Sequence, residues 1–331
     1  MSATITSIAH YLPPDVYPNS YFEKYLETTD EWIQTRSGIK ERRFAKEGAT
    51  SDLIIPAALE CIEKRGIDKN EIDTILVATV TPDHMFPNTA AVVQHKLGIK
   101  NCWGFDISAA CSGFVFAIVT AASLVNSGVS KRVLLCGADK MSSIVNFNDR
   151  GQAILFGDGA GVCLIEKSDD DNYGILDQIL YIDGAGGQYL KQVAGGSYKP
   201  ASIESVQNNE HYIYQDGQSV FKAAVIGMAD VSVEIMKKNN LTSDDIAWLV
   251  PHQANLRIIS ATADRMGIGK DKVMVNIDKY GNTTAATIPI CLSEWHENEK
   301  IKKGDNIILA SFGAGFTWGA AYLKWNMNKG E

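Results

Sequence analysis

Apolar residues along the chain form short runs, and amphipathic segments of helix length separate many of them. Runs rich in aliphatic and β-branched residues predict strands at 3–12, 72–80, 131–137, 162–166, 246–250, 305–315 and 320–325, together with a short strand leading into residue 111. The spacing in the intervening segments predicts helices at 29–36, 50–65, 88–96, 114–125, 219–238 and 255–265, and an apolar helix opening within 280–289. Because helices separate the strands, we predict an α/β fold.

A weak internal repeat divides the chain. Residues 73–99 read as strand, loop and helix, and residues 245–268 repeat that order. A change from strand to helix at Cys111 is matched by a similar change at Asn282. We therefore expect two similar halves, 1–170 and 171–331, whose face-to-face packing brings Cys111 and Asn282 together.

Residues 184–218 interrupt this pattern. They are polar and rich in glycine, and they show little periodicity. A structureless stretch of that length inside a compact chain is often functional. Two interpretations stay open, namely a lid or tunnel wall beside a site and a solvated excursion.

Composition excludes some classes of function. The 331 residues carry a net charge of −8, which argues against nucleic-acid binding and requires any acidic partner to dock on a local basic patch. No uninterrupted apolar segment reaches the roughly 18 residues of a membrane span. The first residues lack the pattern of a signal peptide, so we expect a cytoplasmic protein that does not bind membranes.

The six cysteines form no C-x-x-C pair. Their spacing fits neither a zinc site nor a dense disulfide framework, so no metal is expected. Several lie in apolar runs, which predicts buried thiols in a reducing compartment.

Three polar residues stand where predicted strands end. Cys111 lies among small residues at the start of a helix, where backbone N–H groups and the helix dipole favour a reactive thiolate. The alternative is a small buried apolar residue, which most cysteines are when taken alone. His252 follows a strand and Pro251, and Asn282 follows Gly281. Because sites gather at the carboxyl ends of strands in α/β sheets, we expect these three side chains to meet.

At this point the sequence resembles a known family. Residues 106–114, 251–257, 280–286 and 312–319, with 29–39 and 148–150, are similar to the motifs of β-ketoacyl-acyl-carrier-protein synthase III, a condensing enzyme of the thiolase superfamily. The resemblance covers essentially the whole chain. Plant polyketide synthases share the Cys-His-Asn set but lack the segment with Trp32 and Arg36, and thiolases would need a second catalytic cysteine in place of Asn282.

The resemblance implies a fold and a reaction. The fold is a duplicated, five-layer α-β-α-β-α sandwich that forms a homodimer. The reaction initiates type II fatty acid synthesis, in which an acyl-CoA primer and malonyl-acyl-carrier protein give 3-oxoacyl-acyl-carrier protein, CoA and CO2 through an acyl-Cys111 intermediate. No cofactor is implied. His252 and Asn282 would stabilise the enolate formed by decarboxylation.

The resemblance also implies roles for surrounding residues. Backbone N–H groups of Cys111 and of the turn at Gly313 and Ala314 would form an oxyanion hole; the family often has glycine where Ala314 stands. The remaining expected site residues are Trp32, Arg36 and Arg150 for CoA, Arg257 and Lys222 for the carrier protein, and Phe86, Met141, Phe156 and Phe312 for the acyl pocket. Of these, Phe86 would reach the pocket of the partner subunit. Asp264 departs from the basic residues of some members, and Asp158 is expected to stabilise a turn.

Two other functions stay open at this stage. One is a synthase or acyltransferase of secondary metabolism with the same fold, making resorcinol, quinolone or polyketide precursors. The other is a non-catalytic acyl-binding partner subunit. The sequence does not determine the chain length or branching of the primer.

Overall fold

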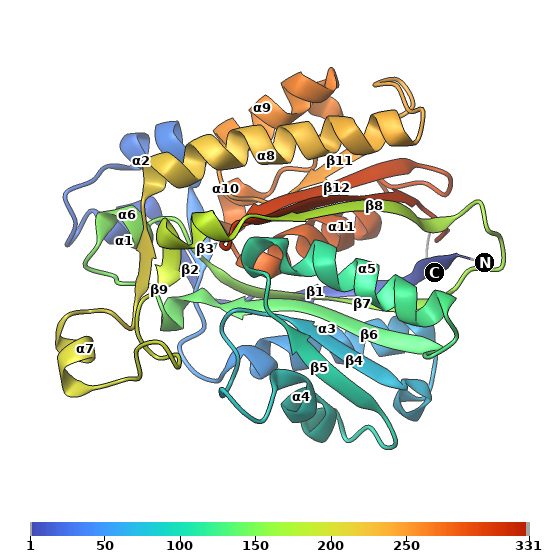
Figure 1. The fold of residues 1–331 in the computed structure, drawn as a ribbon, viewed down its shortest axis with the longest axis horizontal. Coiled ribbons are helices and arrows are strands. Elements are labelled where there is room, and N and C mark those ends of the chain that lie inside the picture. The colour runs from blue at the N-terminus through green and yellow to red at the C-terminus, as the bar shows by residue number, and fades with distance from the viewer. Residues whose placement is uncertain (1, 329–331) are drawn as a thin grey trace.

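Two mixed β-sheets and three layers of helices make up the computed structural model, which describes residues 2–328 (Figure 1). The first sheet has the order β1 (Ala3–Tyr11), β7 (Asp158–Lys167), β6 (Arg132–Lys140), β4 (Thr74–Ala78) and β5 (Trp103–Ile107). The second has the order β11 (Trp248–Pro251), β12 (Asn306–Gly313), β13 (Thr317–Lys324) and β8 (Gly174–Ile182).

The helices complete a five-layer sandwich (Figure 1). On the outer side of the first sheet lie α3 (Thr50–Arg65) and α4 (Thr89–Leu97), and on the outer side of the second lie α8 (Gly217–Lys238) and α9 (Leu256–Met266). Between the sheets lie α5 (Gly113–Asn126) and α11 (Thr287–Glu297). This is the expected fold class.

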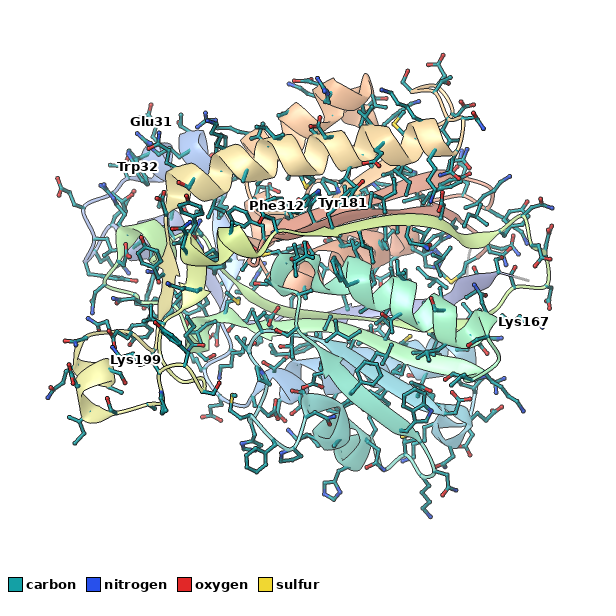
Figure 2. The ribbon with its side chains drawn as sticks, in the orientation of Figure 1. Glu31, Trp32, Lys167, Tyr181, Lys199 and Phe312 are labelled. Atoms are coloured by element: carbon teal, nitrogen blue, oxygen red, sulfur yellow. The ribbon has the colours of Figure 1, made fainter. Side chains whose placement is uncertain are left out.

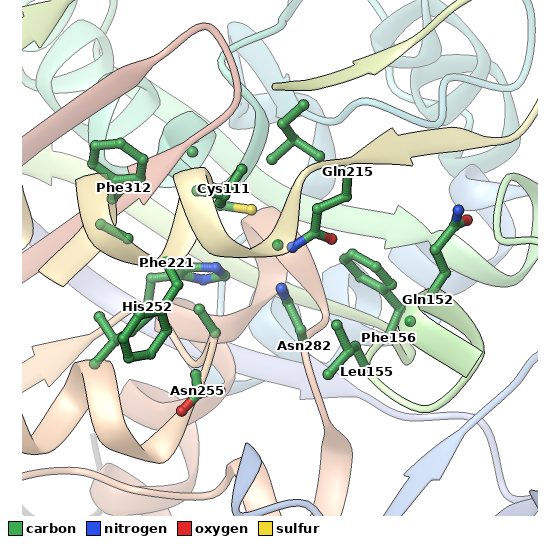
Figure 3. Close-up of a pocket in the computed structure, with 18 of the residues that line it drawn as sticks. Cys111, Gln152, Leu155, Phe156, Gln215, Phe221, His252, Asn255, Asn282 and Phe312 are labelled. Atoms are coloured by element: carbon green, nitrogen blue, oxygen red, sulfur yellow. The ribbon is translucent and has the colours of Figure 1, made fainter. Parts of the chain in front are cut away.

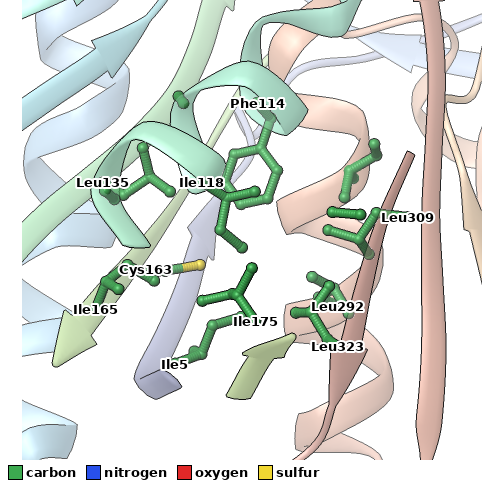
Figure 4. Close-up of a cluster of buried hydrophobic side chains, with 14 of the residues drawn as sticks. Ile5, Phe114, Ile118, Leu135, Cys163, Ile165, Ile175, Leu292, Leu309 and Leu323 are labelled. Carbon is green, nitrogen blue, oxygen red and sulfur yellow. The ribbon is translucent and has the colours of Figure 1, made fainter. Parts of the chain in front are cut away.

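The innermost layer joins the two sheets through one apolar cluster (Figure 4). Phe114 and Ile118 of α5 pack there with Leu135 of the first sheet and Leu309 of the second. Strands such as β4 are buried along their whole length, because helices cover both faces of the sheet. Sheets of this kind require nearly continuous apolar runs, which explains why those strands were readable from the sequence.

Residues 16–44 belong to the first half of the chain but pack against elements of the second half. They contain β2 (Val16–Pro18), α1 (Asn19–Phe22), α2 (Asp30–Ser37) and β3 (Glu41–Arg43). Their buried side chains pack with those of α8 and β12 in one cluster. A division of the chain at residue 170 therefore separates the two sheets but not the packing of their outer layers.

The structure corrects several predicted elements. The helix expected to open within 280–289 begins only at Thr287, after α10 (Ile277–Tyr280) and a 3-10 turn, η6 (Thr284–Ala286). Strand β8 was not predicted, because Asp177 and Gln178 interrupt its apolar residues. The other short elements are η1 (Lys69–Glu71), η2 (Ala110–Ser112), η3 (Met141–Ser143), α6 (Arg150–Ala153) and η5 (Lys270–Lys272).

The polar stretch 184–218 is not a structureless loop. It contains η4 (Gly184–Gln188), β9 (Leu190–Gln192), α7 (Ile203–Gln207) and β10 (Ile213–Gln215), and β9 and β10 pair with each other. The outer part, which includes Lys199, extends away from the sandwich (Figure 2). Within residues 2–328, no helix is both long and apolar enough to cross a membrane.

Candidate active site

Cys111 lies in the 3-10 turn η2, directly before α5. Its turn is held by the opposite sheet, since Ser112 Oγ donates to the Thr317 carbonyl over 2.9 Å and Thr317 Oγ1 donates to the Ala109 carbonyl over 3.0 Å. The preceding residue, Ala110, has a φ of 47°, in the left-handed region that side chains other than glycine seldom adopt. The nucleophile candidate is thus held by contacts between the two sheets.

His252 follows β11, and its backbone N–H donates to the Ala310 carbonyl over 2.8 Å. Its ring Nδ1 lies 2.8 Å from Thr287 Oγ1. The buried amide of Gln253 supports the same loop by donating to the Pro251 carbonyl over 2.7 Å. Ring atom Nε2 is buried and has no hydrogen-bond partner among the described residues, so it is available to a substrate.

Asn282 is bonded across the two halves of the chain. Its backbone N–H donates to the Leu155 carbonyl over 2.9 Å, and its own carbonyl accepts from Gly157 N over 3.0 Å. The side-chain Oδ1 accepts from Thr284 N over 2.9 Å. The side-chain amide nitrogen is left to face Cys111, whose thiolate form Asn282 favours.

One pocket brings the three residues together (Figure 3). The Cys111 sulfur, the His252 ring and the Asn282 amide nitrogen are directed into the same space, although they come from three different segments (Figure 3). Gly313 and Phe312 line this pocket as well. The arrangement places one nucleophile beside two hydrogen-bonding groups, as acyl transfer requires.

Electrostatics correct one expectation about Cys111. Burial, followed by the negative charge of Asp139, raises the pKa of the Cys111 thiol to about 12, although its own backbone N–H and Asn282 act in the opposite direction. In the free protein the thiol is therefore protonated, because loss of hydration outweighs the effect of the helix N-terminus. Burial also lowers the pKa of His252 to about 3, so its imidazole is neutral.

Cys111 also lines a second cavity, which is mainly apolar. Met141 and Phe156 line it, together with Ile144 and Ile213. Phe312 does not, because it is on the outward face of β12, where it packs against Phe316 and Trp318 and lines only the first pocket. Phe86 is 86% exposed and lines neither of these two cavities of its own chain.

Two arginines lie over the ring of Trp32. The guanidinium carbons of Arg36 and Arg150 each lie 4.6 Å from the centre of the Trp32 ring. The neighbours of Arg150, Asp149 and Gly151, line the first pocket. A flat aromatic ring flanked by fixed positive charge suits a nucleotide with phosphates.

The expected docking residues lie on neighbouring outer helices. Arg257 of α9 stacks 4.8 Å above the ring of Phe221, and exposed Lys222 is the next residue of α8. Asp264 shares a shallow surface pocket with Arg257. The basic surface at this place is thus small and carries one acidic residue on its margin.

The 184–218 stretch, for which the sequence left a wall of a site and a solvated excursion open, contributes to the pocket. Leu190 and Gln215 of its two strands line the pocket of Cys111, and the Gln215 amide points toward Cys111 and Asn282 (Figure 3). The Oε1 atom of Gln215 is buried without a hydrogen-bond partner among the described residues. This part of the stretch is a wall of the site, whereas the outer part is a solvated excursion. No local signal distinguishes the two parts, because only the fold brings β10 to the pocket.

Other candidate residues have structural roles. Asp158, the first residue of β7, accepts hydrogen bonds from Ala45 N and from the backbone and side chain of Ser142, which connects η3 to the segment after β3. Burial raises the pKa of the thiols of Cys61, Cys136, Cys163 and Cys291. Within the described residues, no group of three or more histidine, cysteine or acidic side chains could hold a metal ion.

Comparison with known families gives two matches within the chain. Residues 105–196 match the model of 3-oxoacyl-[acyl-carrier-protein] synthase III, and residues 236–325 match the model of its C-terminal part. The first range contains Cys111, and the second contains His252, Asn282 and Gly313.

Full-length relatives extend these matches. The chain is 55% identical over 328 residues to the β-ketoacyl-[acyl-carrier-protein] synthase III of Chlorobaculum tepidum, which covers 98% of this chain and 100% of that protein. The solved 3-oxoacyl-[acyl-carrier-protein] synthase III of Aquifex aeolicus superposes with a TM-score of 0.90 at 41% identity, covering 98% and 100% of the two chains. The priming β-ketosynthase of the R1128 polyketide pathway also superposes with a TM-score of 0.90, at 32% identity and with coverage of 98% and 96%.

Proposed function

The chain belongs to the 3-oxoacyl-[acyl-carrier-protein] synthase III family, and on that premise we propose how its own residues divide the reaction. The protein is a condensing acyltransferase that initiates fatty acid synthesis. Its substrates are an acyl-CoA and malonyl-acyl-carrier protein, and its products are 3-oxoacyl-acyl-carrier protein, CoA and CO2. The observation that carries the division of roles is the shared pocket of Cys111, His252 and Asn282.

In the first half-reaction Cys111 receives the acyl group. Its sulfur bonds to the thioester carbon of the primer, the bond from that carbon to the CoA sulfur breaks, and the thiol proton passes to the CoA sulfur. Because burial keeps the thiol protonated, the proton must leave as the new bond forms. Backbone N–H groups of Cys111 and of the turn at Gly313 and Ala314 stabilise the negative oxygen of the tetrahedral intermediate.

In the second half-reaction the malonyl group loses CO2. The electron pair of the broken carbon–carbon bond moves onto the thioester as an enolate, and His252 Nε2 and Asn282 Nδ2 donate hydrogen bonds to its oxygen. The carbanion then attacks the acyl carbon, and the Cys111 sulfur leaves and regains a proton. Donation by Nε2 requires Thr287 Oγ1 to donate to Nδ1, which the 2.8 Å contact permits.

The surrounding features supply binding. Trp32, Arg36 and Arg150 bind the nucleotide of CoA, and Arg257 and Lys222 receive the acidic carrier protein. The apolar cavity with Met141 and Phe156 holds the primer. We further propose a homodimer in which Phe86 enters the partner's acyl cavity, a role that its exposure of 86% supports. A cytoplasmic location stays a prediction from the sequence.

The test follows the acyl group. Radiolabelled acyl-CoA primers are incubated first with the protein alone and then with malonyl-acyl-carrier protein. We expect label on the wild type, none on Cys111→Ala, and a 3-oxo product in the second step. Label without product would indicate a simple transferase, and absence of label would exclude both enzymatic functions. A panel of straight and branched primers identifies the preferred chain.

His252→Ala separates the two half-reactions. We expect acylation of Cys111 to be retained and decarboxylation to fall by about a hundred- to a thousandfold, the usual effect of removing one such hydrogen-bond donor. Both are measured on the same preparation, by label on the protein and by release of CO2. An equal loss of both would show that the roles are not divided in this way.

A further inference from the structure

Each half of the fold contains the same turn before its central helix. In the first half η2 leads into α5, and in the second η6 leads into α11. The first residues of the two turns, Ala110 and Thr284, share a left-handed backbone with φ of 47° and 54°. The residues that begin the helices, Gly113 and Thr287, also agree, with φ and ψ of −51° and −46° in one and −57° and −47° in the other. Cys111 and Ala285 therefore occupy equivalent positions.

Each turn also lies against the central strand of the opposite sheet. Gly313 near the end of β12 is paired with Thr317, and a side chain there would place its Cβ 2.7 Å from the backbone nitrogen of Cys111. Asp139 near the end of β6 is paired with Gly159, and its Oδ2 accepts a hydrogen bond from Ala285 N over 3.1 Å. Asp139 and Gly313 are thus equivalent positions as well.

The two halves differ in the residue that faces the backbone N–H groups of the turn before the central helix. At Cys111 the facing residue is glycine, which leaves room for the negative oxygen of a substrate. At Ala285 the facing residue supplies a carboxylate oxygen. We propose that Asp139 is a positioning residue whose carboxylate occupies, in the second half, the place that the substrate oxyanion takes in the first. It thereby holds the turn that carries Asn282.

The contacts of Asp139 suit such a role. The side chain is fully buried, and Oδ1 accepts hydrogen bonds from Thr79 Oγ1, Val80 N and both Thr81 N and Thr81 Oγ1, over 2.8 to 3.2 Å. Oδ2 alone reaches across to Ala285. The carboxylate therefore links the loop after β4 to the turn that follows Asn282, in which Thr284 N also bonds Asn282 Oδ1.

The charge of Asp139 has an effect that can be measured through the pKa of Cys111. Burial raises the pKa of Asp139 to about 6, so the carboxylate is charged at higher pH, and that charge contributes to the raised pKa of the Cys111 thiol. The other titratable groups that line the two cavities beside Cys111 are neutral His252, Asp149 and Lys191. Removing the charge of Asp139 should lower the pKa of Cys111.

The test is Asp139→Asn, with the pH dependence of iodoacetamide alkylation of Cys111 as the readout. The amide oxygen of the new side chain can still accept hydrogen bonds from the loop after β4. The amide nitrogen then points its own N–H groups at the N–H of Ala285, which can no longer donate there. We expect alkylation to begin at lower pH, with a rate at pH 8 about tenfold above wild type, which corresponds to a shift of about one pKa unit. Decarboxylation should fall more than acylation, because the Asn282 turn loses its anchor.

Thr79→Val is the matched control. It removes one hydrogen bond to the same carboxylate and keeps the charge, so its alkylation profile should stay at the wild-type pH. Asp139→Gly, which copies Gly313, replaces Asp139→Asn if the latter fails to fold, as judged by circular dichroism and thermal melting. An unchanged alkylation profile in a folded variant, or equal loss of both half-reactions without a shift, would overturn the proposal.

The positioning role rests on the proposed function, but the two can fail separately. If the wild type forms no 3-oxo product, the proposed function is wrong. The alkylation profile tests Asp139 without any substrate.

Discussion

At the scale of the residue, the chemistry of His252 depends on one hydroxyl group. Thr287 Oγ1 lies 2.8 Å from His252 Nδ1 and 3.1 Å from the Thr284 carbonyl, and it has a single proton to donate. When that proton goes to Nδ1, Nε2 carries the proton that an enolate needs. We expect Thr287→Val to slow decarboxylation about tenfold, in line with the loss of one neutral hydrogen bond. Release of CO2 from malonyl-acyl-carrier protein measures it.

Thr287→Ser is the control, since it keeps the hydroxyl and should retain most of the wild-type rate. If serine and valine behave alike, the effect comes from packing around Thr287 and not from the hydrogen bond to His252.

At the scale of the element, strand β12 and turn η2 leave no room for a side chain at Gly313. A methyl group there would lie 2.7 Å from Cys111 N and 3.0 Å from Ser112 N, closer than carbon and nitrogen pack without displacement. We expect Gly313→Ala to lower the rate of Cys111 acylation by at least about tenfold, because it covers the N–H group that binds the oxyanion. Stopped-time labelling with acyl-CoA measures this rate.

Ala314→Gly tests the neighbouring position with the opposite change. It keeps the backbone N–H group, so acylation should stay near the wild-type rate. Wild-type acylation of Gly313→Ala would show that Cys111 N does not take part in the oxyanion hole.

At the scale of the whole molecule, the central layer makes the two sheets one folding unit. Leu309 is fully buried in the cluster that also contains Ile118 and Leu135 (Figure 4). We expect Leu309→Ala to lower the free energy of unfolding by about 2 to 5 kcal/mol, the cost of a large-to-small change in a packed core. Because the cluster spans both halves, denaturant unfolding should remain a single transition at a lower midpoint.

Leu59→Ala is the matched surface variant. Leu59 is 51% exposed, so the free energy of unfolding should change by no more than about 0.5 kcal/mol. Separate transitions for the two halves would contradict a shared core.

Particular residues show how much of the structure could be predicted from the sequence. The helix α2 and the buried strands followed from local patterns, and the structure has them, with Thr29 rather than Asp30 as the cap of α2. The motifs around Cys111, His252 and Asn282 identified the family that the comparisons show. Strand β8 was missed because Asp177 and Gln178 interrupt its apolar residues. Phe312 was expected to line the acyl pocket; it lines the pocket of Cys111 and His252 but not the second, apolar cavity.

By itself the sequence determined the strongly periodic helices, the buried strands and the family to which the chain belongs, because periodicity and motifs are local properties. Only the tertiary structure decided the state of the site. Cys111 was expected to be a thiolate, yet burial and Asp139 keep it protonated. Gln215 reaches the pocket and Asp139 reaches Ala285 through contacts between residues far apart in the chain. Burial and long-range hydrogen bonds set pKa values and orient side chains, and neither exists until the two halves have packed together.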